Sequence, residues 1–145
     1  MRIDEFRQLE LQYRVKMPKL LLMSTPDKPA SVEQIHSVEE MLGVSLPHSY
    51  RDFLREYGGG DYFSLTVFSA DPSSDFYLPL QAARASSYLP NDLLPISDDY
   101  CGGNYVLTVK DAIASERVSY WNTDGGLVVT EFETVLDFVA QKAFG

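Results

Sequence analysis

His36 and His48 are the only residues of the type that most often serves as a general acid or base near neutral pH. His36 precedes Glu39 and Glu40 by three and four residues, a spacing that places all three on one helix face. One such face supplies too few ligands for a metal ion, so we interpret it as a solvated surface and predict no metal site. A cryptic enzyme remains the least favoured alternative. Either histidine in a pocket beside Asp or Glu with a bound ligand would favour it, and a solvent-facing His36 would disfavour it.

Three other clusters lack the full pattern of a known site. The acidic, glycine-rich segment Asp98–Asn104 has neither the alternating ligand spacing nor the terminal glutamate of a calcium-binding loop. Gly58–Gly60 follows a helix and precedes no Lys-Ser/Thr pair, so it does not match a phosphate-binding loop. Cys101 is the only cysteine, which excludes an internal disulfide, and we expect it to be semi-buried and structural. The sequence therefore predicts no catalytic residue and no cofactor.

Acidic residues are concentrated in the second part of the chain. The net charge is −9, and residues 61–145 hold twelve Asp and Glu against four Lys and Arg, whereas residues 1–60 hold nine against eight. Such a surface repels the phosphates of nucleic acids and attracts a basic protein. Acidic surfaces also keep proteins in solution, and composition alone leaves both explanations open.

We expect the acidic part to carry a partner-binding surface. Aromatic side chains are enriched at binding hot spots, and two tyrosines stand beside an aspartate at a loop or strand edge. For Trp121, inside a strand of alternating polarity, packing is favoured over an interface role. The predicted partner-binding residues are Asp61, Tyr62, Asp71, Asp75, Asp92, Asp98, Asp99, Tyr100 and Asp124.

Residues 31–61 encode a pair of helices, and we expect the elements that position the predicted binding residues to pack on this pair. Ser31 and Gln34 match a capping box, and Gly43 suits a left-handed residue that ends the first helix. Pro47 suits the first position of the second helix, which carries an apolar face and ends at a run of three glycines.

Hydrophobic periodicity predicts the elements on either side of this pair. It predicts helices over 2–16, 79–88 and after a Thr134 cap, strands over 61–68, 93–97 and 105–109, and a hairpin of 118–122 with 127–132 across an Asp-Gly turn. A short strand or extended cover is expected over 19–23, and a connector over 110–117. The pattern predicts an α+β fold but does not fix the strand order.

The chain length suits a single domain, 1–145, with one core. Met1–Glu5 carries charges where a signal peptide needs an apolar run, and no stretch approaches the roughly 20 apolar residues of a membrane span. Together with the lone cysteine, these features lead us to expect a cytoplasmic protein that does not contact membranes.

Two sets of residues form a pattern that spans most of the chain. The first set is Ile35, Glu39, Leu42–Gly43, Leu46–Pro47, Ser49–Tyr50, Phe53–Leu54, Tyr57 and Gly59–Gly60. The second set is Leu94–Pro95–Ile96, Asp98, Gly102–Gly103–Asn104, Val118, Tyr120–Trp121–Asn122 and Phe138. In these residues and their order the sequence resembles the SUKH superfamily over roughly residues 31–143, while 68–92 match poorly and 1–30 form an N-terminal helix and cover segment outside the specific part.

This resemblance implies an α+β fold with a mostly antiparallel sheet and flanking helices. The superfamily includes many bacterial immunity proteins, which bind and block a cognate toxin, commonly a nuclease, and a yeast regulator of cell-wall synthesis. We therefore predict an immunity protein that contacts a basic toxin directly, with a regulatory scaffold for a cellular partner as the alternative. The motif positions of the helix pair are assigned to folding, and the partner-binding residues are predicted from charge alone.

Overall fold

The computed structural model describes all 145 residues, and its two central helices lie close to the predicted positions. They are α3 (Val32–Leu42) and α4 (His48–Glu56). Ser31 and Gln34 form the expected capping box, in which Ser31 Oγ accepts the Gln34 N–H at 3.1 Å. Gly43 ends α3 at a φ of 66°, a left-handed conformation that glycine adopts without steric cost. Pro47 is the residue before α4 instead of its first residue, so the helix begins at His48.

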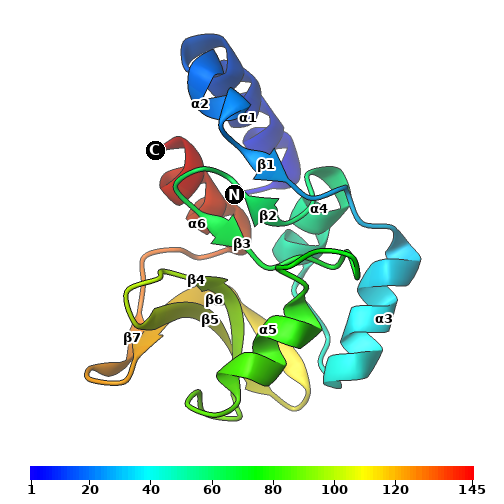
Figure 1. Cartoon of the computed structure of the whole chain (residues 1–145), viewed down its shortest axis with the longest axis vertical. Helices are drawn as coiled ribbons and strands as arrows, with labels where there is room; N and C mark the ends of the chain where they lie inside the picture. The colour runs from blue at the N-terminus through cyan, green and yellow to red at the C-terminus, as the bar shows by residue number, and fades with distance from the viewer.

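A four-stranded antiparallel sheet forms the lower part of the molecule in Figure 1. Its strands, in order across the sheet, are β4 (Leu93–Asp98), β5 (Gly103–Lys110), β6 (Ile113–Asn122) and β7 (Gly126–Val129). The register pairs Asp98 with Asn104 and Asn122 with Gly126, so the β4–β5 loop and the β6–β7 turn lie at the same end of the sheet. The predicted hairpin between β6 and β7 is confirmed.

A second antiparallel sheet is small and has three strands. They are β1 (Thr25–Pro26), β2 (Gly60–Asp61) and β3 (Thr66–Val67). The prediction of one continuous strand over 61–68 is wrong, because the chain turns back on itself between β2 and β3. Phe63 takes a φ of 70°, and Asp61 Oδ1 accepts its N–H at 2.9 Å, which closes the turn. The Phe68 N–H then donates to Ile96 O at 2.8 Å, so the segment that continues β3 lies along β4.

Two further segments differ from the prediction. Residues 19–23 are not extended but lie mostly in a short helix, α2 (Pro18–Leu22), whose proline occupies the first helical position, where no N–H is needed. The expected connector over 110–117 is a two-residue turn followed by the start of β6. Asp111 and Ala112 both take a positive φ there, which matches the twist of a tight hairpin. This turn is difficult to predict from the sequence, because neither Asp111 nor Ala112 is a glycine.

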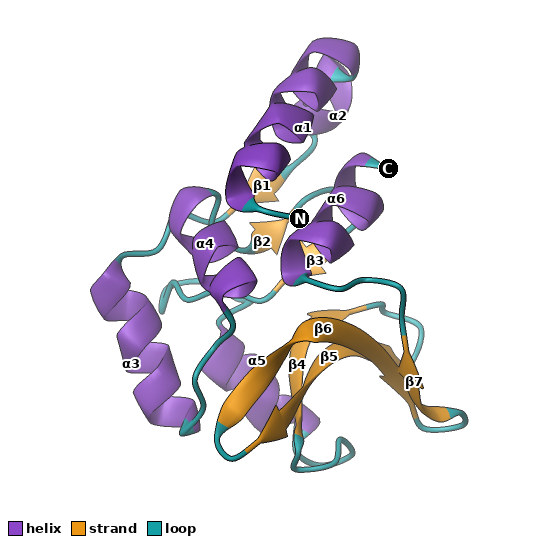
Figure 2. Cartoon of the chain, turned by 180° about the vertical axis from the view of Figure 1, so that it is seen from behind, coloured by secondary structure: helices purple, strands orange, loops and turns teal.

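Helix α6 (Val135–Phe144) lies between the four-stranded sheet and α1 (Ile3–Lys16), as Figure 2 shows. Phe6 of α1 is fully buried, and its ring centroid lies 5.8 Å from that of Phe53 and 5.6 Å from that of Phe144. On its other side α6 contacts the sheet through Phe138, whose ring lies 4.7 Å from that of Tyr105. Aromatic pairs of this kind stabilise a core beyond their buried area. None of the helices combines the length and apolar character that crossing a bilayer requires.

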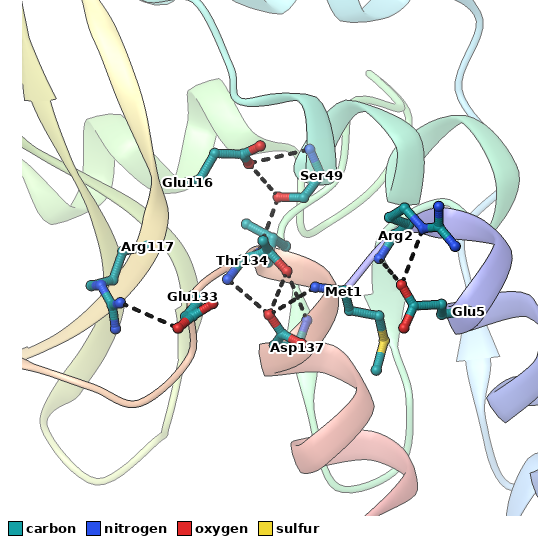
Figure 3. A network of polar contacts seen from close by, with 10 residues as sticks. Met1, Arg2, Glu5, Ser49, Glu116, Arg117, Glu133, Thr134 and Asp137 are labelled. Atoms are coloured by element: carbon teal, nitrogen blue, oxygen red, sulfur yellow. Dashed lines mark hydrogen bonds and ion pairs between the residues drawn. The ribbon is translucent and has the colours of Figure 1, made fainter.

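A buried serine joins α4 to the sheet and to the start of α6 (Figure 3). Ser49 Oγ donates a hydrogen bond to Glu116 Oε1 at 2.6 Å and accepts the Val135 N–H at 3.1 Å. Thr134 and Asp137 add the predicted capping box at the same helix start. These bonds satisfy N–H groups that have no partner within α6, and they fix the helix over the sheet.

Candidate partner-binding surface

Three of the predicted partner-binding residues lie at the last residue of β4 and in the β4–β5 loop, and two of their carboxylates fold the loop. Asp98 Oδ1 accepts the Tyr100 N–H at 2.7 Å. Asp99 Oδ1 accepts the N–H of Cys101 at 2.7 Å and that of Gly103 at 2.9 Å. Aspartates commonly close turns by accepting an N–H two residues further on. The second oxygen of Asp98 makes no hydrogen bond within the chain, so it is available to a partner.

Asp99 is also held by a residue of β6, another strand of the same sheet. The Tyr120 hydroxyl of β6 donates a hydrogen bond to Asp99 Oδ2 at 2.5 Å. Burial alone raises the pKa of Asp99, but the hydrogen bonds from Tyr120, Cys101 and Gly103 outweigh it and hold the pKa below its ordinary value. The same bond to the carboxylate raises the pKa of Tyr120. Both oxygens of Asp99 are therefore used inside the protein, where they position the loop.

Tyr100 lies at the tip of this loop, with 67% of its surface exposed. Its φ of 59° is in the left-handed region, which tyrosine rarely adopts. The bond to Asp98 and a bond from the Tyr100 hydroxyl to Thr66 Oγ1 at 3.1 Å hold it in this conformation. The ring is therefore exposed in one defined orientation, which lowers the entropy that a partner must overcome to bind it.

Two hollows share Asp98 and Tyr100. The larger, of about 480 Å³, is also lined by Asp75 and by Tyr88, which follows α5 (Leu78–Ala85). Two carboxylates beside two tyrosine rings suit a lysine or arginine side chain, which can pair with the acids and lie against the rings. Arg84 also lines this hollow, so a cation of a partner has to pair with carboxylates that lie beside Arg84.

The smaller hollow, of about 220 Å³, is lined by Asp98, Asp99 and Tyr100 together with residues of β3 and α6. Lys142 of α6 contributes its cation here and lies 5.3 Å above the centroid of the Tyr105 ring. Each hollow contains one basic side chain, Arg84 in the larger and Lys142 in the smaller, but only the larger is lined by two carboxylates that keep a free oxygen, Asp75 and Asp98. The larger hollow is therefore the better place for a cation of a partner.

The structure separates the remaining predicted aspartates. Asp124 is exposed in the β6–β7 turn, at the same end of the sheet as the β4–β5 loop. Asp92 is exposed just before β4, at the opposite end. Asp61 closes the β2–β3 turn, and Asp71 accepts the Ser73 N–H at 3.0 Å, which lowers the pKa of Asp71. We use the name acidic end for the group of Asp75, Asp98, Asp99, Tyr100 and Asp124.

Two predictions about exposure are wrong. Tyr62 is only 8% exposed, and its hydroxyl donates to Gly58 O at 2.6 Å, so it is a core residue instead of a surface anchor. Cys101 is exposed in the β4–β5 loop and not semi-buried, because the turns at Asp98 and Asp99 direct this segment out of the fold.

Tyr88 and Tyr120 support the acidic end and are absent from the predicted residues. The Tyr88 hydroxyl donates to Asn104 Oδ1 at 2.9 Å, and its ring stacks on Trp121 at 5.9 Å between centroids. Trp121 itself is buried, which confirms its expected packing role. No local spacing relates these residues: Tyr88 follows α5, and the register of β5 and β6 places Trp121 opposite Asn104, to which Tyr88 donates its hydrogen bond. The only available signal is the tyrosine and tryptophan content of this part of the chain.

The two histidines lie on the helix pair, His36 in α3 and His48 at the start of α4. His36 is exposed and pairs with Glu40 at 3.1 Å, as a solvated helix face predicts. His48 is also exposed, and both line a hollow of about 260 Å³ between α3 and α4. The neighbouring Glu39 accepts the Leu46 N–H at 2.7 Å and is thereby tied to the backbone. Sequence spacing did not show that the histidines share a hollow, and no group of three or more potential metal ligands forms around them.

Comparison with known families gives one match. The sequence pattern of the SMI1/KNR4 family (SUKH-1) matches residues 29–141. That segment includes the two central helices, the whole four-stranded sheet and most of α6, and it leaves α1 and α2 outside. A search of curated proteins finds no match.

Proposed function

Because the chain belongs to the SMI1/KNR4 family (SUKH-1), we propose that it is an immunity protein that binds a cognate toxin and blocks it by direct contact. Proteins of this family are often immunity proteins and are generally non-catalytic. In this proposal the protein acts in the cytosol of the cell that makes the toxin, and it forms a stoichiometric complex without changing its partner chemically.

The observation that supports a toxin as partner most strongly is the acidic end of the sheet. Asp75, Asp98 and Asp124 keep carboxylate oxygens without a hydrogen-bonded partner in the chain, and none of the three forms an ion pair. A nuclease toxin must bind phosphates, so its active face is basic. An acidic surface that carries an ordered aromatic ring beside Asp75 and Asp98 is complementary to such a face.

The proposed mechanism has two parts. The field of the acidic residues accelerates encounter with the basic toxin, since opposite charges steer association. Tyr100 then enters an apolar site on the toxin, while a toxin cation occupies the hollow between Asp75 and Asp98. The bound chain covers the surface that the toxin needs for its substrate. Asp99 contributes indirectly, because it holds the loop that carries Tyr100.

The test is co-expression with the product of the adjacent gene, measured as colony survival, followed by binding kinetics with the purified pair. We expect the wild-type chain to protect the cells. The double variant Asp75→Asn/Asp98→Asn should associate about tenfold more slowly at low salt, because steering is lost. Asp92→Asn is the matched control, because it removes an exposed carboxylate at the opposite end of the sheet.

Two outcomes oppose the proposal, and a third opposes the proposed binding surface. Cells that die despite expression of the folded chain would show that it does not block this toxin. Capture of a single housekeeping protein, with a loss of that protein's regulation when the gene is deleted, would assign the chain to the regulatory members of the family instead. If Asp92→Asn slows association as much as the double variant does, the toxin binds elsewhere.

A further inference from the structure

Strand β7 has a free outer edge. It is the last strand of the order β4–β5–β6–β7, and no backbone group of Gly126–Val129 bonds to any element other than β6. The opposite edge of the sheet is covered, because Phe68 N–H donates to Ile96 O at 2.8 Å and Ser97 Oγ donates to Thr66 O at 2.5 Å. The large sheet therefore offers one row of unpaired N–H and C=O groups.

The side chains of this strand are apolar and exposed on both faces. Leu127 is 45% exposed, Val128 54% and Val129 65%. Proteins protect edge strands by keeping them very short, by placing a lysine or a proline on them, or by covering them, and of these devices β7 has only its short length of four residues. An unpaired backbone edge with aliphatic side chains is the surface used when a partner adds a strand to a sheet.

We propose that β7 binds an extended, basic segment of the toxin as an added strand of this sheet. This inference rests on the proposed function and names the second part of the interface. Asp124 and Glu131 are exposed at the two ends of β7 and form no ion pair, whereas the nearby Glu133 is paired with Arg117 at 3.9 Å. A segment in which lysine or arginine alternates with aliphatic residues complements this arrangement.

The same charges disfavour a second copy of this chain as the occupant. In the antiparallel register that overlaps all four residues, Leu127 faces Val128 of the second copy. Continued outward, that register places Asp124 opposite Glu131, twice per dimer. Like charges directly opposite each other on paired strands are destabilising, and each copy carries a net charge of −9.

Strand β7 is also continuous with the acidic end. Asp124 lies in the turn that begins the strand, at the end of the sheet that carries the β4–β5 loop. A toxin segment added along β7 would therefore bring the rest of the toxin towards Tyr100. One basic partner can use both surfaces, which explains why a free apolar edge lies next to aspartates.

A peptide titration tests the strand addition directly. The probe is a synthetic peptide of alternating lysine and valine, added to the full-length ¹⁵N-labelled chain. We expect shift changes and slower amide hydrogen exchange confined to residues 126–129 and their neighbours. A peptide with glutamate in place of lysine should leave the spectra unchanged. Binding of the acidic peptide, or changes located elsewhere, would overturn the proposal.

Val129→Lys places a charge on the free edge and should weaken peptide and toxin binding by roughly tenfold. Val15→Lys is the matched control, because it makes the same change at an 82% exposed position on α1.

Unchanged toxin affinity and full protection with Val129→Lys would remove β7 from the interface but would not contradict the proposed immunity function. Failure of the wild-type chain to protect would remove the toxin itself as the occupant. A dimer that Val129→Lys dissociates, measured by sedimentation, would assign the edge to a second copy and overturn the proposal.

Discussion

The Tyr120 hydroxyl donates a hydrogen bond to Asp99 Oδ2 at 2.5 Å, across 21 residues of sequence. This bond attaches the β4–β5 loop to β6, and the other Asp99 oxygen folds the loop around Cys101 and Gly103. The exposed Tyr100 lies between these fixed points. Its orientation therefore depends on a tyrosine that does not belong to the loop.

We predict that Tyr120→Phe loosens the loop without unfolding the protein. The loss of a hydrogen bond to a charged group should cost about 1.5 kcal/mol of unfolding free energy and raise the pKa of Asp99 towards its ordinary value. Urea unfolding measures the first effect, and carboxyl NMR titration measures the second. Tyr105→Phe is the control, because Tyr105 lies in the adjacent strand and its hydroxyl makes no hydrogen bond in the chain. Equal effects of the two variants would contradict the role of Tyr120.

Stability should fall in acid because the pKa values of Asp99 and Asp71 are lowered in the folded chain. Carboxylates of this kind stabilise the fold fully above their unfolded pKa of about 3.9, and the stabilisation is lost as the pH falls through the folded pKa. Urea midpoints should be level near neutral pH and drop below about pH 4. Asp99→Asn should reduce the size of this drop, whereas Asp92→Asn should leave it unchanged. A slope that is the same in both variants would show that Asp99 does not contribute.

The helix pair and the last helix could be predicted because their signals are local. The Ser31 and Thr134 capping boxes and the left-handed Gly43 each involve residues within a few positions. The predicted strand over 61–68 is wrong although the contacts that interrupt it are also local. Its alternating polarity suits a strand, but the bond of Asp61 to the Phe63 N–H and the pairing of β2 with β3 replace the strand with a hairpin.

The acidic end was predicted only in part. Composition identified Asp75, Asp98 and Asp124 as acids of one region, but charge gave no means of separating Asp92, which lies at the other end of the sheet. The internal use of Asp99 follows from the register of β5 and β6, which no short-range pattern encodes. That β7 is the free edge follows from the strand order, which places it last beside β6.

Gly43→Val should destabilise the protein through its backbone alone. A Cβ added at Gly43 meets no atom within 4 Å, so the cost is the strain of a β-branched residue at a φ of 66°. We expect a loss of about 1–2 kcal/mol, which lowers Tm by several degrees in a chain of this size. Gly43→Asn should cost less, because asparagine tolerates the left-handed region. If the valine and asparagine variants melt at the same temperature, backbone strain is not the cause.

Tyr100 should control how long the toxin complex lasts, whereas the aspartates control how fast it forms. Tyr100→Ala removes the exposed ring, and we expect roughly 30-fold weaker binding, mostly through faster dissociation. Tyr100→Phe loses the bond to Thr66 but keeps the ring, so its affinity should stay within about threefold of the wild type.

The salt dependence separates the role of the ring from that of the charges. Raising the salt concentration from about 0.05 M to about 0.5 M should slow association of the wild type, Tyr100→Ala and Tyr100→Phe alike, because it screens the charges. The ratio of their dissociation rates should persist, since contacts of an apolar ring are not screened. Surface plasmon resonance at the two salt concentrations separates these effects, and a Tyr100→Ala defect that disappears at high salt would show that the ring acts through charge and not as an anchor.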